Sequence, residues 1–185
     1  MNRLKTGAML LALTAILAAC GKQSAPAVDG STTPEAKTEA PAASAGSSIS
    51  FVDTQEGKPM TIDPKLFDTP AAKEFLATGK NPYVGNEEQI KKGKRIFGLY
   101  SCTQCHGPEA RGQVGPGLIG PTFRYPKNAT NKGMFETIWH GTNGGMGAKG
   151  LGLMNPGTPE DGIKPDEILQ VISWIRSQGT LTGNE

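Results

Sequence analysis

A cysteine pair followed at once by a histidine constrains this chain more than any other feature. The segment reads Cys102-Thr-Gln-Cys105-His106. Two thiols at this spacing can bond to the two vinyl groups of a haem, and the next residue then presents an imidazole to the iron. A CxxC pair also occurs in redox dithiols and as half of a zinc site. Because His140 is the only other histidine, a zinc site here would have to use these four side chains.

The beginning of the chain determines how the third cysteine is interpreted. Residues 1–19 contain basic Arg3 and Lys5 followed by an apolar run, which is the pattern of an export signal. The run is short for a membrane span, which needs about 20 apolar residues. It ends in Leu17-Ala-Ala-Cys20 and resembles the bacterial lipobox, so we expect a lipoprotein signal peptide and a lipidated Cys20. An ordinary signal peptide with an incidental cysteine is the alternative.

The residue after the lipobox and the overall charge bear on location and partners. Gly21 stands where many bacteria place Asp in lipoproteins kept at the inner membrane, so the lipobox resemblance favours the outer membrane. We expect the chain on the periplasmic side of a bacterial membrane, held there by its lipid. The formal net charge is +2, and removal of the signal peptide takes away two basic residues. This near-neutral balance argues against nucleic acid as a partner.

Composition sets the remaining boundaries. Residues 20–48 consist mainly of Ala, Pro, Ser, Thr, Gly, Glu and Lys. Such a segment cannot bury enough apolar surface to offset the entropy lost on ordering, so we predict a disordered tether. The composition becomes globular at Ile49. We assign 49–85 to an N-terminal extension, 86–179 to the main domain and 180–185 to a tail.

Capping signals and apolar periodicity predict four helices. Thr69 can cap the first helix, which has Pro70 in its first position and Gly79 just past its end. The others run, in chain order, from a cap at Asn86 through Tyr100 towards Cys102, from about Lys132 to Trp139, and from Pro165 to about Ser177. Two short strands joined at Glu56-Gly57 precede them. The pattern therefore indicates a mostly α fold.

The sixth ligand of a haem iron has four candidates downstream of the motif. Met134 lies on a predicted helix, where methionine is usually a core residue. Met146 lies within Gly144-Gly-Met-Gly147, where glycines let the backbone approach a flat cofactor. We favour Met146, while Met154 in another glycine-rich stretch and His140 at a helix end remain open. Histidine and methionine together raise the reduction potential and leave the iron no open position, which indicates electron transfer.

The order of these features resembles the class I cytochromes c over about residues 86–178. That class implies three to five helices around one covalently bound haem, here with a short N-terminal extension. Gly115-Pro-Gly-Leu118 matches a loop of the class, which implies that the carbonyl of Pro116 accepts a hydrogen bond from His106. Gly93 matches the small residue at which the first and last helices of these proteins cross.

Several segments resemble one branch of this class, the cytochrome c-L family, which accepts electrons from quinoprotein methanol dehydrogenases. The matching stretches are Asp68-Thr-Pro-Ala-Ala-Lys-Glu-Phe-Leu-Ala-Thr-Gly79, Asn81-Pro-Tyr83, Gly115-Pro-Gly-Leu118, Tyr125-Pro-Lys-Asn-Ala-Thr-Asn-Lys-Gly-Met-Phe-Glu-Thr-Ile138 and Gly145-Met-Gly147. The resemblance implies Met146 as the axial ligand, a PQQ-dependent methanol or alcohol dehydrogenase as electron donor, and another cytochrome or an oxidase as acceptor. The family also has a calcium site, for which this sequence identifies no ligands.

Two other functions remain alternatives. One is a general membrane-tethered cytochrome c of a respiratory chain, and the other is a haem sensor or enzyme whose iron keeps an open position. For an electron carrier we expect docking at an apolar haem edge formed by Val114, Ile119, Phe123 and the loop of Met146. The basic run from Lys91 to Arg95 fits either a docking patch or an ordinary solvated helix face.

Overall fold

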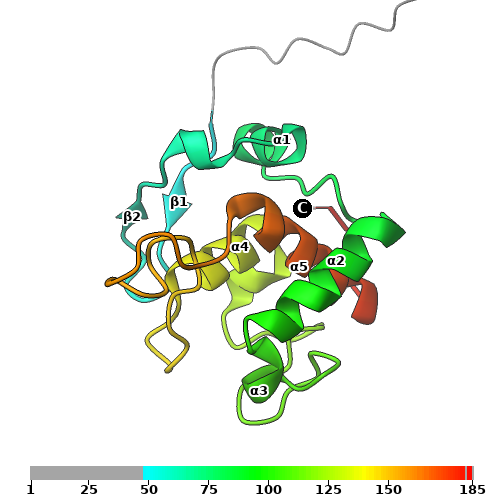
Figure 1. Cartoon of the computed structure of the whole chain (residues 1–185). Helices are drawn as coiled ribbons and strands as arrows, with labels where there is room; N and C mark the ends of the chain where they lie inside the picture. Colours follow the sequence, from blue (N-terminus) through cyan, green and yellow to red (C-terminus); the bar gives the residue numbers. More distant parts are fainter. Residues whose placement is uncertain (1–47, 182, 185) are drawn as a thin grey trace, which may run out of the picture. The chain divides into compact units, whose positions relative to one another are not determined.

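The computed structural model describes residues 48–181, 183 and 184 (Figure 1). The predicted signal peptide, Cys20 and nearly all of the predicted tether lie outside these residues. The elements, in chain order, are β1 (Phe51–Val52), β2 (Pro59–Met60), the 3₁₀ helix η1 (Pro64–Leu66), α1 (Pro70–Thr78), α2 (Glu87–Leu99), α3 (Cys102–His106), the 3₁₀ helix η2 (Pro126–Ala129), α4 (Asn131–His140) and α5 (Pro165–Gln178). The prediction of a mostly α fold is confirmed.

The helices begin and end where their capping residues predict. The Thr69 side chain accepts a hydrogen bond from the backbone N–H of Ala72 at the start of α1, and Gly79 ends this helix in the left-handed conformation. Asn86 caps α2 through the N–H groups of Glu88 and Gln89. These side chains satisfy backbone donors that have no partner inside the helix.

Helices α2 and α5 cross at very close range. A Cβ atom on Gly93 would lie 2.5 Å from the carbonyl carbon of Gln170, well inside van der Waals contact. One turn further along α2, the rings of Phe97 and Trp174 pack with their centroids 4.5 Å apart. The glycine therefore lets the two helix backbones meet, and the aromatic pair fills the space beside the crossing.

The N-terminal extension is part of the same hydrophobic core. Phe51, Phe67 and Phe75 cluster around Phe135 of α4, with ring centroids 4.9 to 6.0 Å from it. At the first turn of α5, Asp166 accepts hydrogen bonds from the hydroxyl groups of Thr69 and Tyr83. The extension thus packs against α4 and α5, and Figure 1 shows β1 and α1 above them.

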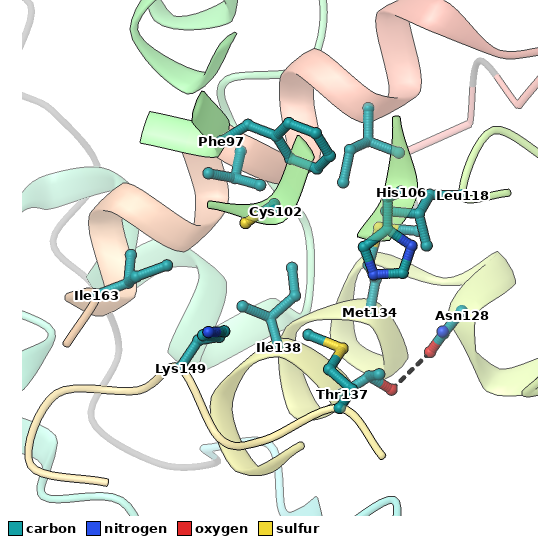
Figure 2. A pocket seen from close by; sticks show the side chains of 13 residues that line it. Phe97, Cys102, His106, Leu118, Asn128, Met134, Thr137, Ile138, Lys149 and Ile163 are labelled. Carbon is teal, nitrogen blue, oxygen red and sulfur yellow. Dashed lines mark hydrogen bonds between the residues drawn. The ribbon is translucent and has the colours of Figure 1, made fainter. Parts of the chain in front are cut away.

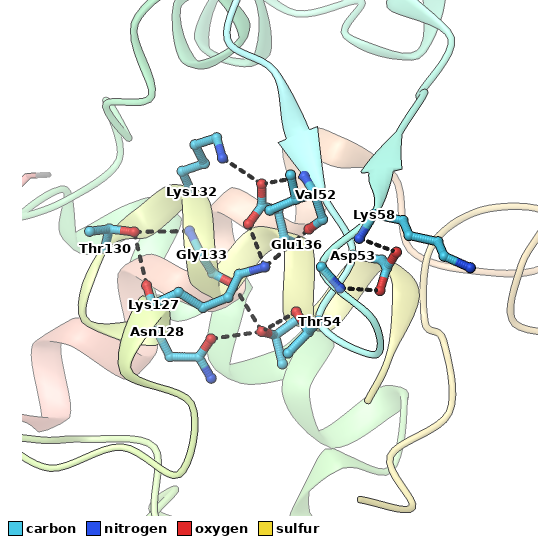
Figure 3. Close-up of polar contacts among 12 residues, drawn as sticks. Val52, Asp53, Thr54, Lys58, Lys127, Asn128, Thr130, Lys132, Gly133 and Glu136 are labelled. Atoms are coloured by element: carbon cyan, nitrogen blue, oxygen red, sulfur yellow. Dashed lines mark hydrogen bonds and ion pairs between the residues drawn. The ribbon is translucent and has the colours of Figure 1, made fainter. Parts of the chain in front are cut away.

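A pair of antiparallel strands, β1 and β2, is fixed onto α4 by a buried carboxylate. Glu136 is 1% exposed and pairs with the ammonium groups of Lys127 and Lys132. It also accepts a hydrogen bond of 2.8 Å from the backbone N–H of Val52 (Figure 3). This arrangement anchors the first strand on the helix.

The structure departs from the predicted helices at the cysteine motif. Helix α2 stops at Leu99, and Ser101 adopts a left-handed conformation with φ of 58°. The motif then forms its own short helix, α3, so it is not a continuation of α2. The break changes the chain direction immediately before Cys102.

No helix among residues 48–181, 183 and 184 is long and apolar enough to cross a membrane.

Candidate haem site

Helix α3 presents the side chains of the motif in three different environments. His106 is buried at 8% exposure, Cys102 is half-buried, and Cys105 is exposed. The Nδ1 atom of His106 lies 2.8 Å from the carbonyl oxygen of Pro116. Because a carbonyl oxygen can only accept, Nδ1 must carry the proton, which leaves the lone pair of Nε2 free to bind a metal.

The loop after α3 is folded back onto the histidine. The N–H of Gly112 donates a hydrogen bond to the carbonyl of His106 at 2.9 Å, and the N–H of Gly115 donates one to the carbonyl of Cys105 at 2.7 Å. A Cβ atom on Gly115 would stand 3.2 Å from the imidazole ring, tighter than most contacts of this kind. The loop therefore needs glycine here to bring the Pro116 carbonyl up to the ring.

A largely apolar cavity of about 440 Å³, part of it open to solvent, lies beside the motif. Side chains from α2, α3, α4, α5 and the intervening loops surround it, as Figure 2 shows for most of them. They are Phe97, Cys102, His106, Leu118, Asn128, Met134, Thr137, Ile138, Met146, Lys149, Ile163, Val171 and Ile175.

These residues fit a haem. The cavity offers one thiol and one imidazole on the same wall, and apolar side chains suited to the faces of a porphyrin form most of the rest. Cys105, the second thiol, is on the exposed side of α3. A covalently attached haem would thus be held by one thiol that lines the cavity and one that is exposed.

The cavity separates the candidates for the sixth ligand. Met146 and Met134 line it, whereas Met154 and His140 do not. Met134 is 2% exposed on α4 and belongs to the core, as expected for a helical methionine. Met146 is partly buried in the loop after α4 and is flanked by exposed glycines.

Two observations disfavour the alternative uses of the cysteine pair, which are a redox dithiol and half of a zinc site. Burial raises the pKa of its thiol, and the nearby positive charge of Lys149 offsets only part of this effect. Nucleophilic and redox-active cysteines require a lowered pKa. No three His, Cys, Asp or Glu side chains of the described residues come together as a metal-binding group.

Three polar residues in the cavity were not predicted as site residues. Asn128 and Thr137 are hydrogen-bonded to each other at 2.7 Å, between Oδ1 of the amide and the hydroxyl group. Lys149 adds the only lysine or arginine side chain among the residues lining the cavity, and none of the ion pairs found in the described residues includes it. Neither a motif nor a helical period marks these positions, so only the folded chain reveals them.

The predicted apolar rim is only partly correct. Val114 is 83% exposed on the loop after α3, as the prediction requires. Phe123 is 9% exposed and belongs to the core, so it would add little apolar area to a docking surface. The prediction failed because the stretch around Phe123 has no periodicity that distinguishes a buried aromatic from an exposed one.

Comparisons with known sequences agree with this geometry. The Cytochrome c family model matches residues 90–179. The chain is 35% identical over 183 residues to cytochrome c-L of Methylorubrum extorquens, and the match covers 95% of this chain and 78% of that protein. The similarity therefore includes the N-terminal extension as well as the part that carries the motif.

Solved structures give the same result. The crystal structure of cytochrome cL from Hyphomicrobium denitrificans matches with a TM-score of 0.60 and 39% identity, over 70% of this chain and 73% of that one. Cytochrome cL from the marine methylotrophic bacterium Methylophaga aminisulfidivorans matches with a TM-score of 0.59 and 36% identity, over 70% and 79%.

Proposed function

Because this chain belongs to the cytochrome c-L family, we propose that it takes electrons from a PQQ-dependent methanol or alcohol dehydrogenase and passes them to another cytochrome or an oxidase. Family membership also means that the chain is a c-type cytochrome, an electron carrier with a covalently bound haem. The identity of the donor is the part that requires an experiment.

The residues of the site suit one-electron transfer without catalysis. A bound haem supplies the redox chemistry at its iron. Cys102 and Cys105 would hold it covalently, and His106 would bind the iron through Nε2, with its ring orientation set by Pro116. The apolar wall of the cavity would limit the contact of water with the cofactor.

The N-terminal extension is the observation that carries the assignment of the donor. A cytochrome c of general type has no need for residues 49–85, yet here they belong to the hydrophobic core and contact α4 and α5. The similarity to cytochrome c-L extends over this region as well. A segment that is both shared with that family and packed into the fold supports a family-specific partner.

Stopped-flow mixing with reduced methanol dehydrogenase tests the proposal. We expect the haem of this cytochrome to be reduced at least tenfold faster than that of an unrelated class I cytochrome c with a similar potential. Equal rates for the two proteins would contradict the assignment and favour a general carrier of a respiratory chain. The rate should also depend on ionic strength if charged residues steer the two proteins together.

We propose Met146 as the sixth ligand, since it lines the cavity and lies in a loop rich in glycine. The ferric protein should show the far-red absorption band of a thioether bound to iron. Met146→Ala should abolish the band, whereas Met154→Ala, on a residue outside the cavity, should keep it. If Met154→Ala loses the band while Met146→Ala keeps it, the assignment of Met146 as the sixth ligand is wrong. A high-spin spectrum of the wild type, together with ready binding of carbon monoxide by its reduced form, would instead indicate an iron with an open coordination position.

We also propose that Cys20, which lies outside the described residues, carries a lipid and holds the protein on the periplasmic side of a membrane. Its position at the end of a lipobox-like segment supports this. Expressed in a Gram-negative host, the wild type should fractionate with membranes and Cys20→Ser should not. Mass spectrometry that finds an unmodified Cys20 would contradict the proposal.

A further inference from the structure

The turn between β1 and β2 touches the loop that carries Met146. Nε2 of Gln55 donates a hydrogen bond of 3.0 Å to the carbonyl of His140, the last residue of α4. Nδ2 of Asn143 donates one of 3.2 Å to the carbonyl of Gln55. The extension therefore contacts the residue just before this loop, which spans residues 141–147, and the loop itself at Asn143.

The turn is held in shape by a carboxylate. Asp53 is 8% exposed and accepts hydrogen bonds from the backbone N–H groups of Glu56, Gly57 and Lys58, at 2.5 to 3.2 Å. The backbone N–H of Asp53 donates in turn to the carbonyl of Lys58. A turn fixed in this way presents Gln55 in a defined position.

The same hairpin is secured on α4 beside the cavity. The hydroxyl oxygens of Thr54 and Thr137 are 3.0 Å apart. Thr137 lines the cavity together with Asn128 (Figure 2). Glu136, the residue before Thr137, holds the backbone of Val52. The position of the turn is thus fixed relative to the haem cavity by two consecutive residues of α4.

A small number of hydrogen bonds hold the loop in place. Gly144 and Gly145 are exposed, and a glycine backbone loses more freedom on ordering than any other. Within the loop, the N–H of Thr142 donates to the carbonyl of Met146 at 2.8 Å. Outside it, Asn143 also accepts a hydrogen bond from the hydroxyl of Tyr125.

We propose that Gln55 is a positioning residue for the axial methionine. Through Gln55, the turn of residues 53–58 would stabilise the 141–147 loop in the conformation in which Met146 can bind the iron. This inference rests on the proposed ligation by Met146. Because an exogenous ligand binds only when the methionine has left, its apparent affinity measures how often the loop opens.

Titration of the ferric holoprotein with imidazole tests whether Gln55 positions the 141–147 loop. Loss of one hydrogen bond of ordinary strength should raise the apparent imidazole affinity of Gln55→Ala about threefold to tenfold. Gln113→Ala is the matched control, because Gln113 is an exposed glutamine whose side chain makes none of the hydrogen bonds found in the described residues. Its imidazole affinity should equal that of the wild type.

Asn143→Ala provides a second variant: it removes the hydrogen bond to the carbonyl of Gln55 together with the one from Tyr125, and it should also raise the affinity. Two results would overturn the proposed role of Gln55: an unchanged imidazole affinity in Gln55→Ala, or an equal rise of this affinity in Gln113→Ala. Met146→Ala serves as the reference: if it keeps the far-red band, the ligand assignment is wrong, and the positioning role of Gln55 is overturned with it.

Discussion

Replacing Gly93 with alanine tests the close crossing of α2 and α5. The added Cβ would clash with the carbonyl oxygen of Gln170 and stand 2.5 Å from its carbonyl carbon, where ordinary contact begins at 3.4 Å, so the backbones must separate by more than 0.9 Å. Overpacking of this kind costs about 3 kcal/mol at the upper end of its usual range. Alanine returns about 1 kcal/mol as the better helix former. We therefore expect Gly93→Ala to lower the free energy of unfolding by about 2 kcal/mol.

The control for this prediction lies on the same helix. Gly98 is exposed, and a Cβ there would meet nothing within 4 Å, so Gly98→Ala should stabilise the protein by up to about 1 kcal/mol. Urea unfolding of the two holoproteins, followed by far-UV circular dichroism, measures both changes. A Gly93→Ala variant at least as stable as the wild type would refute the crossing geometry. A Gly98→Ala variant as damaged as Gly93→Ala would show that α2 tolerates no added methyl group, whatever its surroundings.

Three further predictions concern charged side chains. Lys149→Met removes a positive charge from the cavity lining and should lower the reduction potential in a potentiometric titration, whereas Lys149→Arg should leave it nearly unchanged. Hydrogen bonds from the N–H of Glu56 and its neighbours lower the pKa of Asp53. This carboxylate therefore stabilises the fold above its unfolded pKa of about 3.9, and the effect is lost as the pH falls through the lower folded value. The stability advantage of the wild type over Asp53→Asn should accordingly shrink below about pH 4. Glu136→Ala leaves a buried N–H without its acceptor and should cost about 2–3 kcal/mol in urea unfolding. Glu88→Ala, which breaks a surface ion pair, should cost much less.

Local signals were sufficient to predict most of the helices. Thr69 and Asn86 cap their helices through side-chain oxygens, and such caps act over only a few residues. The break at Ser101 could not be predicted in the same way, because a left-handed serine has no composition signal. The contact between Gln55 and α4 joins residues far apart in the sequence, and no local pattern indicates it.

The haem site was likewise predictable from the sequence only where its features are local. Cys102, Cys105 and His106 were predicted because covalent attachment requires a fixed local spacing, and the carbonyl of Pro116 lies beside the imidazole as the family resemblance implies. Lys149 was missed because an ammonium group in an apolar cavity contradicts the usual preference of lysine for the surface. Its position follows from the path of the loop after Met146, which only the tertiary structure defines.

The crossing at Gly93 also has a consequence for the order of folding. Gly93 and Gln170 are 77 residues apart, and closing a loop of that length costs about 4 kcal/mol of chain entropy. The residues of the haem motif lie inside this loop, next to α2, so they can form α3 and remain accessible before α5 arrives. We expect a chain that ends before Pro165 to accept a haem covalently while failing to enclose it. In this protein the cofactor would then be attached first, and the last helix would close the cavity over it.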